Sequence, residues 1–227
     1  MTPVDFNTIG FHSNEKCWAV IDAANNYLPW LYQNDPAPNY EYLFDDTELI
    51  EAMQVGPIVL ALKNDADLLW LNEKAQSDDK MSLMIISSSL TTEQVLAKLR
   101  EYVIVTFGEN KKGIFRYFDK RVASYFFQNE TLTHLFPGFS ALYWYGNTYV
   151  QQQKEGHRWW GVFHQHEDAS VLSSNDSVLN KSVLESDQSV RLNQVQMQRL
   201  NQMQQEKQQV LQQVTAPESL IPSVFSQ

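Results

Sequence analysis

Short apolar runs alternate with amphipathic segments over the first 120 residues, and this alternation constrains the fold more than any other feature. The runs at 17–22, 57–62 and 81–88 predict buried strands. Amphipathic segments follow two of them, and one begins at Thr91–Gln94 with the Ser/Thr-x-x-Gln pattern of a capping box. Strands that alternate with helices indicate an α/β or α+β lobe with flanking helices.

Two further β-rich runs follow, at 102–107 and 114–118. The turn "GENKKG" joins them and has a glycine at both ends, which predicts a β-hairpin. A hairpin next to strand–helix–strand units predicts a mixed sheet in this lobe.

The character of the chain changes after residue 128. We therefore predict an α/β lobe over 1–128 and a smaller, mainly helical lobe over 129–227. Residues 169–189 are rich in Ser, Asn and Asp and suit a polar linker. Residues 190–214 are Gln-rich but have apolar residues at helix-face spacing, which predicts a helix that needs a packing partner.

Composition limits the class of partner and the compartment. The formal net charge is −10, and no basic stripe suited to nucleic acid or an anionic membrane is visible. The single cysteine, Cys17, excludes an internal disulfide and fits a reducing cytoplasm. No export signal is evident at the N-terminus, and the longest apolar run, "PIVLAL", is too short to span a membrane. We expect a cytoplasmic protein.

No catalytic motif is evident. The chain lacks the nucleophile-elbow, phosphate-loop and dinucleotide patterns, and we expect neither an enzyme nor a bound cofactor. The alternative is a metal-assisted hydrolase built on "HQHED", with His164 and His166, either Glu167 or Asp168, and the upstream His157. Two histidines one residue apart form an incomplete ligand set, so we predict no metal site.

A cluster of aromatic residues marks the predicted second lobe. It is either the core of that lobe or an exposed patch for another protein, because Trp and Tyr carry binding energy at interfaces. Together with apolar residues of the C-terminal helix, it supplies our candidate partner-binding residues: Tyr143, Trp144, Tyr145, Trp159, Trp160, Leu200, Met203 and Val210. The helix could also pair with a second copy as a coiled coil, although it covers only about three heptads.

Arg116 stands inside the aromatic run "IFRYFDKR". If 114–118 is a strand buried on both faces, this charge needs a partner, since an unpaired buried ion costs several kcal/mol. Asp119 is placed to cap the following helix, and it or another carboxylate could pair with Arg116. A catalytic residue and a ligand clamp are the other possibilities. We predict a structural motif that braces the hairpin against the helices, formed by Arg100, Arg116, Tyr117, Asp119 and Arg121.

The string "LREYVIVTFGENKKGIFRYFDKRV" resembles a signature of the effector-adaptor family of the bacterial type VI secretion system. In that signature a Leu-Arg helix end and a Gly-containing turn precede Phe-Arg-Tyr-aromatic-Asp-Pro-Arg, and Lys120 here replaces the proline. The resemblance extends over roughly 17–140. It includes further matches at Asp22, Ala23, Leu43, Phe44, Gly56 and Pro57.

This resemblance implies a non-enzymatic adaptor or chaperone. Such a protein binds the N-terminal region of a secreted effector in the cytoplasm and promotes its loading onto the VgrG spike. The absence of a catalytic constellation in the sequence is compatible with this function.

Overall fold

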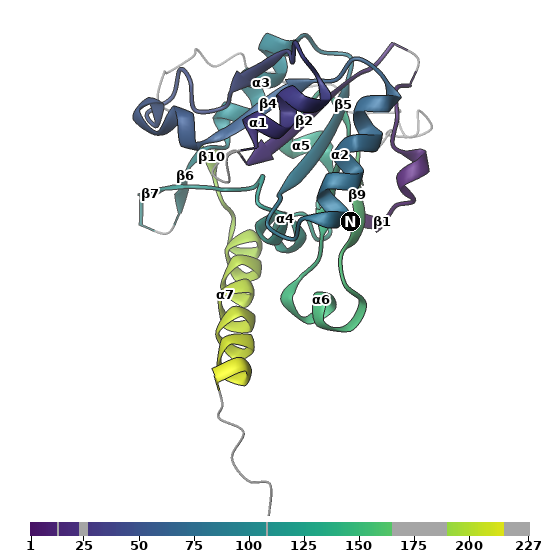
Figure 1. Cartoon of the computed structure of the whole chain (residues 1–227). Helices are drawn as coiled ribbons and strands as arrows, with labels where there is room; N and C mark the ends of the chain where they lie inside the picture. Colours follow the sequence, from purple (N-terminus) through teal and green to yellow (C-terminus); the bar gives the residue numbers. More distant parts are fainter. Residues whose placement is uncertain (13, 23–26, 108, 165–189, 216–227) are drawn as a thin grey trace, which may run out of the picture.

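The computed structural model describes residues 1–12, 14–22, 27–107, 109–164 and 190–215 (Figure 1). A seven-stranded sheet lies at its centre, and all neighbouring strands in it are antiparallel. In spatial order the strands are β1 (Thr2–Pro3), β9 (Arg158–Phe163), β8 (Phe139–Gly146), β5 (Leu83–Ser88), β2 (Lys16–Asp22), β4 (Pro57–Ala61) and β3 (Tyr40–Tyr42). Helices flank this sheet, which confirms the α+β class.

The prediction of a mixed sheet is wrong for this central sheet. Helix α2 (Asp65–Ser77) joins β4 to β5, and both strands run antiparallel to β2. The two strands are therefore parallel to each other, but β2 lies between them. The strand–helix–strand pattern predicted these elements, but it did not predict which strands are neighbours in the sheet.

The predicted hairpin is present, but it forms a separate small sheet. It consists of β6 (Ile104–Phe107) and β7 (Lys111–Ile114), and β10 (Val190–Arg191) pairs with β6 in parallel. The second strand ends at Ile114 and does not extend to residue 118. The chain turns there, and the Asp119 N–H donates to the Arg116 carbonyl at 2.9 Å.

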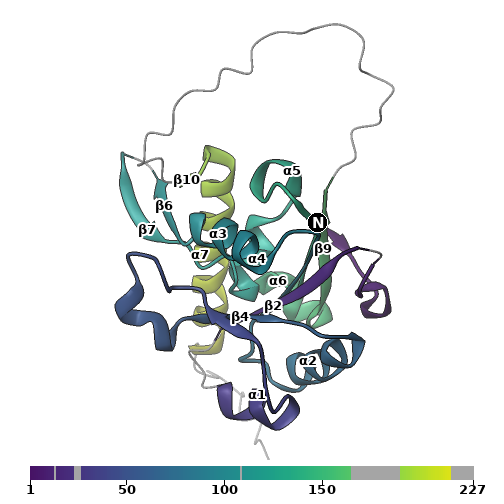
Figure 2. The same ribbon diagram turned by 90° about the horizontal axis from the view of Figure 1, so that it is seen from above.

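Side chains alternate between two cores on opposite faces of the central sheet. On β2, Trp18 and Val20 pack on one face, and Ala19 and Ile21 pack on the other. Figure 2 shows the corresponding layers. Helices α1 (Leu28–Asn34) and α2 cover one face, while α3 (Thr92–Glu101), α4 (Lys120–Phe126) and α5 (Leu132–Leu135) lie on the other.

Local signals set the helix ends. The predicted capping box of α3 is present, with the Gln94 side chain accepting from the Thr91 N–H at 2.9 Å. In α2 the cap is Asn64, whose side chain accepts from the Ala66 N–H at 2.9 Å. The described part of the N-terminal half also contains the short 3₁₀ helices η1 (Phe6–Thr8) and η3 (Ile50–Val55).

The predicted lobe boundary at residue 128 does not divide the sheet. Strands β8 and β9 come from the C-terminal side of that boundary, yet β8 pairs with β5 of the N-terminal side. Residues 139–163 therefore complete the central sheet, and α6 (Tyr149–Glu155) connects its two strands. The predicted linker at 169–189 lies outside the described residues.

The predicted C-terminal helix is present as α7 (Gln194–Thr215), and its far end projects from the body (Figure 1). It packs on α4 and α6. Two carboxylates fix it. Arg199 pairs with Glu130 at 2.6 Å, and Glu206 accepts hydrogen bonds from the Tyr125 hydroxyl and the Val150 N–H. Among the described residues, no helix has the length and apolar character needed to cross a membrane.

Candidate functional site

A hollow of about 200 Å³ opens where β2, β4 and the end of β7 come together. Its lining comes from three distant parts of the chain, and each part includes residues that carry the resemblance described above. We call it the Arg116 hollow, and it is lined by Asp22, Phe44, Val55, Gly56, Pro57, Ile114, Arg116 and Phe118. Most of these side chains are apolar.

An ion pair supplies the charge in this hollow. The Arg116 Nη2 donates to a carboxylate oxygen of Asp22, the last residue of β2. The Arg116 side chain is 51% exposed, whereas that of Asp22 is only 8% exposed. The prediction that Arg116 is buried is therefore wrong, because β7 ends before it and the turn carries it to the surface. The expected carboxylate partner exists, and it lies 94 positions away in the sequence, at the end of β2.

Exposed apolar side chains surround the hollow. Ile114 is 56% exposed and Val55 is 64% exposed. Position 56 in the lining favours glycine, because a Cβ there would lie 2.4 Å from the Phe44 ring. The hollow thus combines an apolar rim with a half-exposed guanidinium, as the centres of protein interfaces do.

Two other residues of the predicted brace hold the walls of the hollow. Arg100 donates to the carbonyls of Tyr42 and Leu43, each at 3.2 Å, and so fixes the segment that carries Phe44. Tyr117 is fully buried, and its hydroxyl donates to the Leu99 carbonyl at 2.9 Å. Both side chains therefore bond to backbone carbonyls of distant segments.

The end of the signature forms the start of α4. Asp119 caps this helix as predicted, accepting from the Arg121 N–H at 2.8 Å. The guanidinium carbon of Arg121 lies over the Tyr149 ring, 4.4 Å from the ring centroid, in a cation–π contact.

Lys120 forms a second charged cluster that the sequence did not reveal. Its side chain is 6% exposed and contacts Asp79, which is 70% exposed. His157 also contacts Asp79, with Nε2 2.7 Å from Oδ1. Burial lowers the pKa of Lys120, and burial followed by the charge of Lys120 lowers the pKa of His157, while Asp79 opposes both shifts. The cluster joins α4 to the start of β9.

The predicted aromatic partner site is wrong. Trp144 and Trp160 belong to one core, Tyr143 and Trp159 to the other, and all four are less than 8% exposed. Tyr145 is partly buried against the second core. Because the cluster lies on two adjacent strands of the central sheet, alternation sends its members to both faces, and they form core and not a patch.

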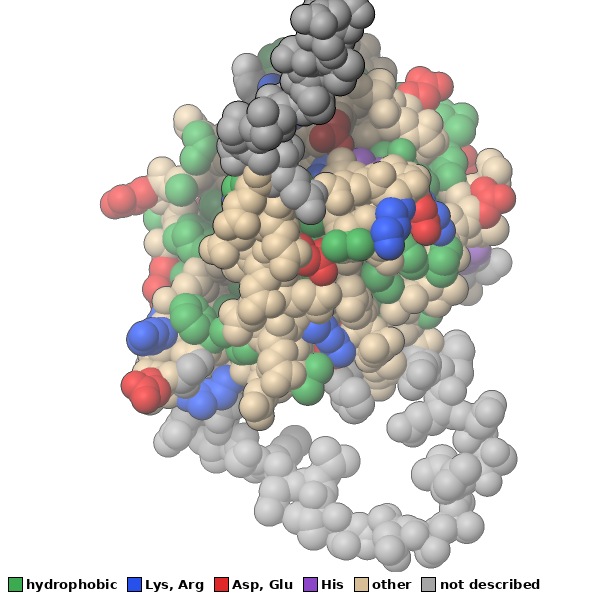
Figure 3. All heavy atoms as spheres, turned by 90° about the horizontal axis from the view of Figure 1, so that it is seen from below, with side chains coloured by type: hydrophobic (Ala, Val, Ile, Leu, Met, Phe, Trp, Pro, Cys, Tyr) green, Lys and Arg blue, Asp and Glu red, His purple; other side chains and the backbone are tan. Residues whose placement is uncertain are grey.

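The C-terminal helix carries both half-buried and exposed apolar side chains, and Val195 and Leu211 are 51% and 54% exposed. Leu200, Met203 and Val210 are half-buried on α7, and Leu200 packs against the core. Viewed from the side on which α7 projects, hydrophobic side chains form separate groups among tan spheres, which mark backbone and uncharged polar side chains (Figure 3). Pairing of α7 with a second copy as a coiled coil stays a prediction.

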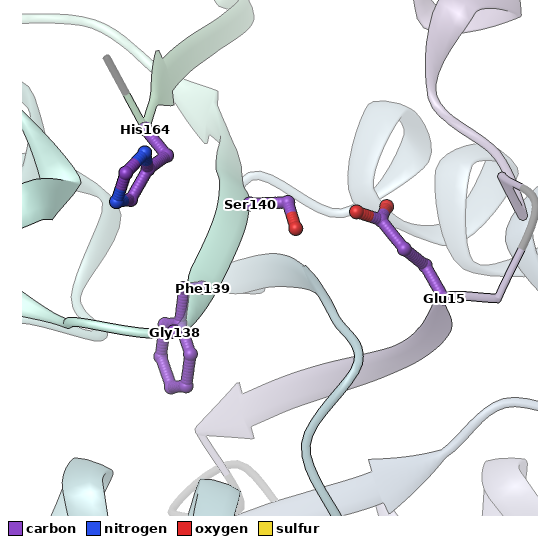
Figure 4. Close-up of a pocket in the computed structure, with 5 residues that line it drawn as sticks. All are labelled: Glu15, Gly138, Phe139, Ser140 and His164. Atoms are coloured by element: carbon purple, nitrogen blue, oxygen red, sulfur yellow. The ribbon is translucent and has the colours of Figure 1, made fainter. Parts of the chain in front are cut away.

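The proposed metal ligands do not come together. His157 and His164 flank the six-residue strand β9, so they lie roughly 20 Å apart along it. His164 lines a hollow of about 260 Å³ together with Glu15, Gly138, Phe139 and Ser140. In Figure 4 the Ser140 and Glu15 side chains point toward each other, and the His164 ring lies across β8 from them. No three His, Cys, Asp or Glu side chains in the described parts of the chain are placed to hold a metal ion. His166, Glu167 and Asp168 lie outside those parts.

Comparison with known proteins gives one family match. The family described as "Domain of unknown function (DUF4123)" matches residues 17–135, more than half of the chain. No curated protein and no solved structure matches. The matched range contains every residue that lines the Arg116 hollow.

Proposed function

The chain belongs to the DUF4123 family, and on this premise we propose that it is a non-enzymatic adaptor for protein secretion. It binds a type VI secretion effector in the cytoplasm and promotes the loading of that effector onto the VgrG spike. The family match by itself does not indicate an activity. The function comes from the resemblance of the Arg116 to Arg121 signature to that of the effector adaptors.

One observation supports a binding role most directly: the separate blocks of the resemblance converge on the Arg116 hollow. Asp22, Gly56 and Arg116 come from three distant segments, yet they line one surface feature. Residues needed only for packing would be buried, whereas Arg116, Ile114 and Val55 are at least half exposed.

The chemistry of the hollow suits a protein partner. Its volume of about 200 Å³ accommodates one large side chain. An apolar anchor inserted there would remove Ile114 and Val55 from water, and the exposed guanidinium would donate a hydrogen bond to an oxygen of the partner.

Capture of the partner tests this function. The tagged chain is recovered from native cytosol, and mass spectrometry identifies what accompanies it. We expect a stoichiometric secreted toxin that is retained by the wild type and lost from Ile114→Asp, since a carboxylate cannot enter an apolar rim without cost.

Leu69→Asp is the matched control. Leu69 is also 56% exposed but lies on α2, which covers a different face of the sheet. Absence of any partner, or equal loss of the partner from both variants, would contradict the proposal.

A further inference from the structure

We infer that β7 accepts an extended segment of the partner as an additional strand, with one apolar side chain of that segment in the Arg116 hollow. This inference rests on the proposed function and specifies how the partner binds. The segment carries an apolar residue flanked by acidic ones. Its recognition combines backbone hydrogen bonds with a single side-chain pocket.

The first argument is the open edge of β7. The small sheet has the order β10-β6-β7, so β7 has no neighbour on its outer side among the described strands (Figure 2). With four residues, it is the longest of the four strands at sheet edges; β1 and β10 have two residues each, and β3 has three.

The hydrogen-bond pattern between β6 and β7 shows which backbone N–H and C=O groups of β7 point away from β6. The Phe115 N–H donates to the Val103 carbonyl at 2.8 Å, and Gly113 is the register partner of Val105. In an antiparallel pair, alternate residues bond inward, so the backbone groups of Lys112 and Ile114 face the open edge. These are the N–H and C=O groups that an added strand would use.

The second argument is the position of the hollow beside this edge. Ile114 and Arg116 line it, and Ile114 is the last residue of β7. Directly opposed side chains on neighbouring strands lie about 4.5–5.5 Å apart. A side chain placed opposite Ile114 on an added strand would therefore reach the hollow.

The third argument is charge. Lys111 and Lys112 lie on the edge, and the guanidinium of Arg116 follows them at the surface. Lysines on an edge strand oppose indiscriminate pairing. Here they select an acidic segment, although Lys112 already lies 3.6 Å from Glu48, so part of its charge is compensated.

Two substitutions at one position test strand addition. Both Lys112→Ala and Lys112→Pro remove the lysine side chain, but only proline removes the outward N–H, and edge positions tolerate proline. The probe is the secreted protein captured by the wild type, purified by itself. We expect Lys112→Pro to weaken its binding at least about tenfold relative to Lys112→Ala.

Amide hydrogen exchange supplies a second measurement that needs no variant. The Lys112 and Ile114 amides should exchange quickly in the free protein and become protected in the complex. Equal affinity of Lys112→Pro and Lys112→Ala, with no added protection, would overturn strand addition while leaving the adaptor function intact.

Two other outcomes point to different occupants. A concentration-dependent dimer of the wild type that Lys112→Pro abolishes would assign the edge to a second copy and overturn the inference. Failure of the wild type to bind any effector would remove the proposed function itself, and the inference with it.

Discussion

Two ion pairs from one short stretch of chain are built in opposite ways. In the Arg116–Asp22 pair, the cation is 51% exposed and the carboxylate is 8% exposed. In the Lys120–Asp79 pair, only four residues later, the cation is 6% exposed and the carboxylate is 70% exposed. The first pair leaves positive charge at the surface of a hollow, where a partner can reach it. The Lys120–Asp79 pair buries its cation, so only groups within the protein can contact the ammonium.

Under the proposed function, this difference separates residues of the signature that contact a partner from residues that stabilise the fold. Lys120 and His157 share Asp79 and join α4 to the strand that completes the sheet. Their contacts are internal, so substitutions there should change stability first. Substitutions at Arg116 should change stability less and binding more.

The largest expected effect is from Asp79→Ala. This change takes an acceptor from Lys120 and from His157 and leaves a buried ammonium without its counterion. We expect the free energy of unfolding to fall by about 2–4 kcal/mol, measured by urea denaturation.

The double variant Lys120→Met/Asp79→Ala provides the control. Removing both charges should restore most of the loss, because an apolar pair of similar size leaves no buried ion. Equal stability of wild type and Asp79→Ala would show that the cluster contributes nothing and would remove the contrast with Arg116.

A smaller loss of about 1–2 kcal/mol is expected for Arg116→Ala. The substitution leaves the Asp22 carboxylate without this cation, but Arg116 is half exposed, so water replaces part of the interaction. Arg116→Lys should recover part of the stability in thermal unfolding. Binding of the effector should fall more for Arg116→Ala than for Asp79→Ala when both are measured below their unfolding transitions; the reverse order would break the comparison.

Local features of the fold could be predicted from the sequence. The strand at 17–22, the capping box at Thr91 and the cap at Asp119 depend on residues close together in the chain, and the structure confirms all three. The order of strands depends on distant pairings, so the insertion of β2 between β4 and β5 was not visible in the pattern.

The candidate site shows the same limit. Its residues were identified in the sequence as separate matches, but Asp22 and Arg116 are 94 positions apart, and nothing local pairs them. The charged end of the apolar run "CWAVID" was the available signal. The sequence leaves open whether Trp144 and Trp160 are core or surface, because the neighbouring strands that decide this are not visible in it; in the structure both are core.

The smallest expected effect is a pH dependence confined to the Lys120 cluster. Burial and the charge of Lys120 lower the pKa of His157 below its ordinary 6.5. The unfolded chain therefore binds this proton more strongly than the folded one, so the stabilising contribution is complete above pH 6.5 and is lost as the pH falls below it. The slope in this range should not exceed about 1.4 kcal/mol per pH unit. His157→Gln should reduce it in urea denaturation between pH 7 and 5, and Arg116→Lys should leave it unchanged. An unaltered slope in His157→Gln would mean that protonation is tolerated at this position, and that the cluster is less strictly internal than its burial indicates.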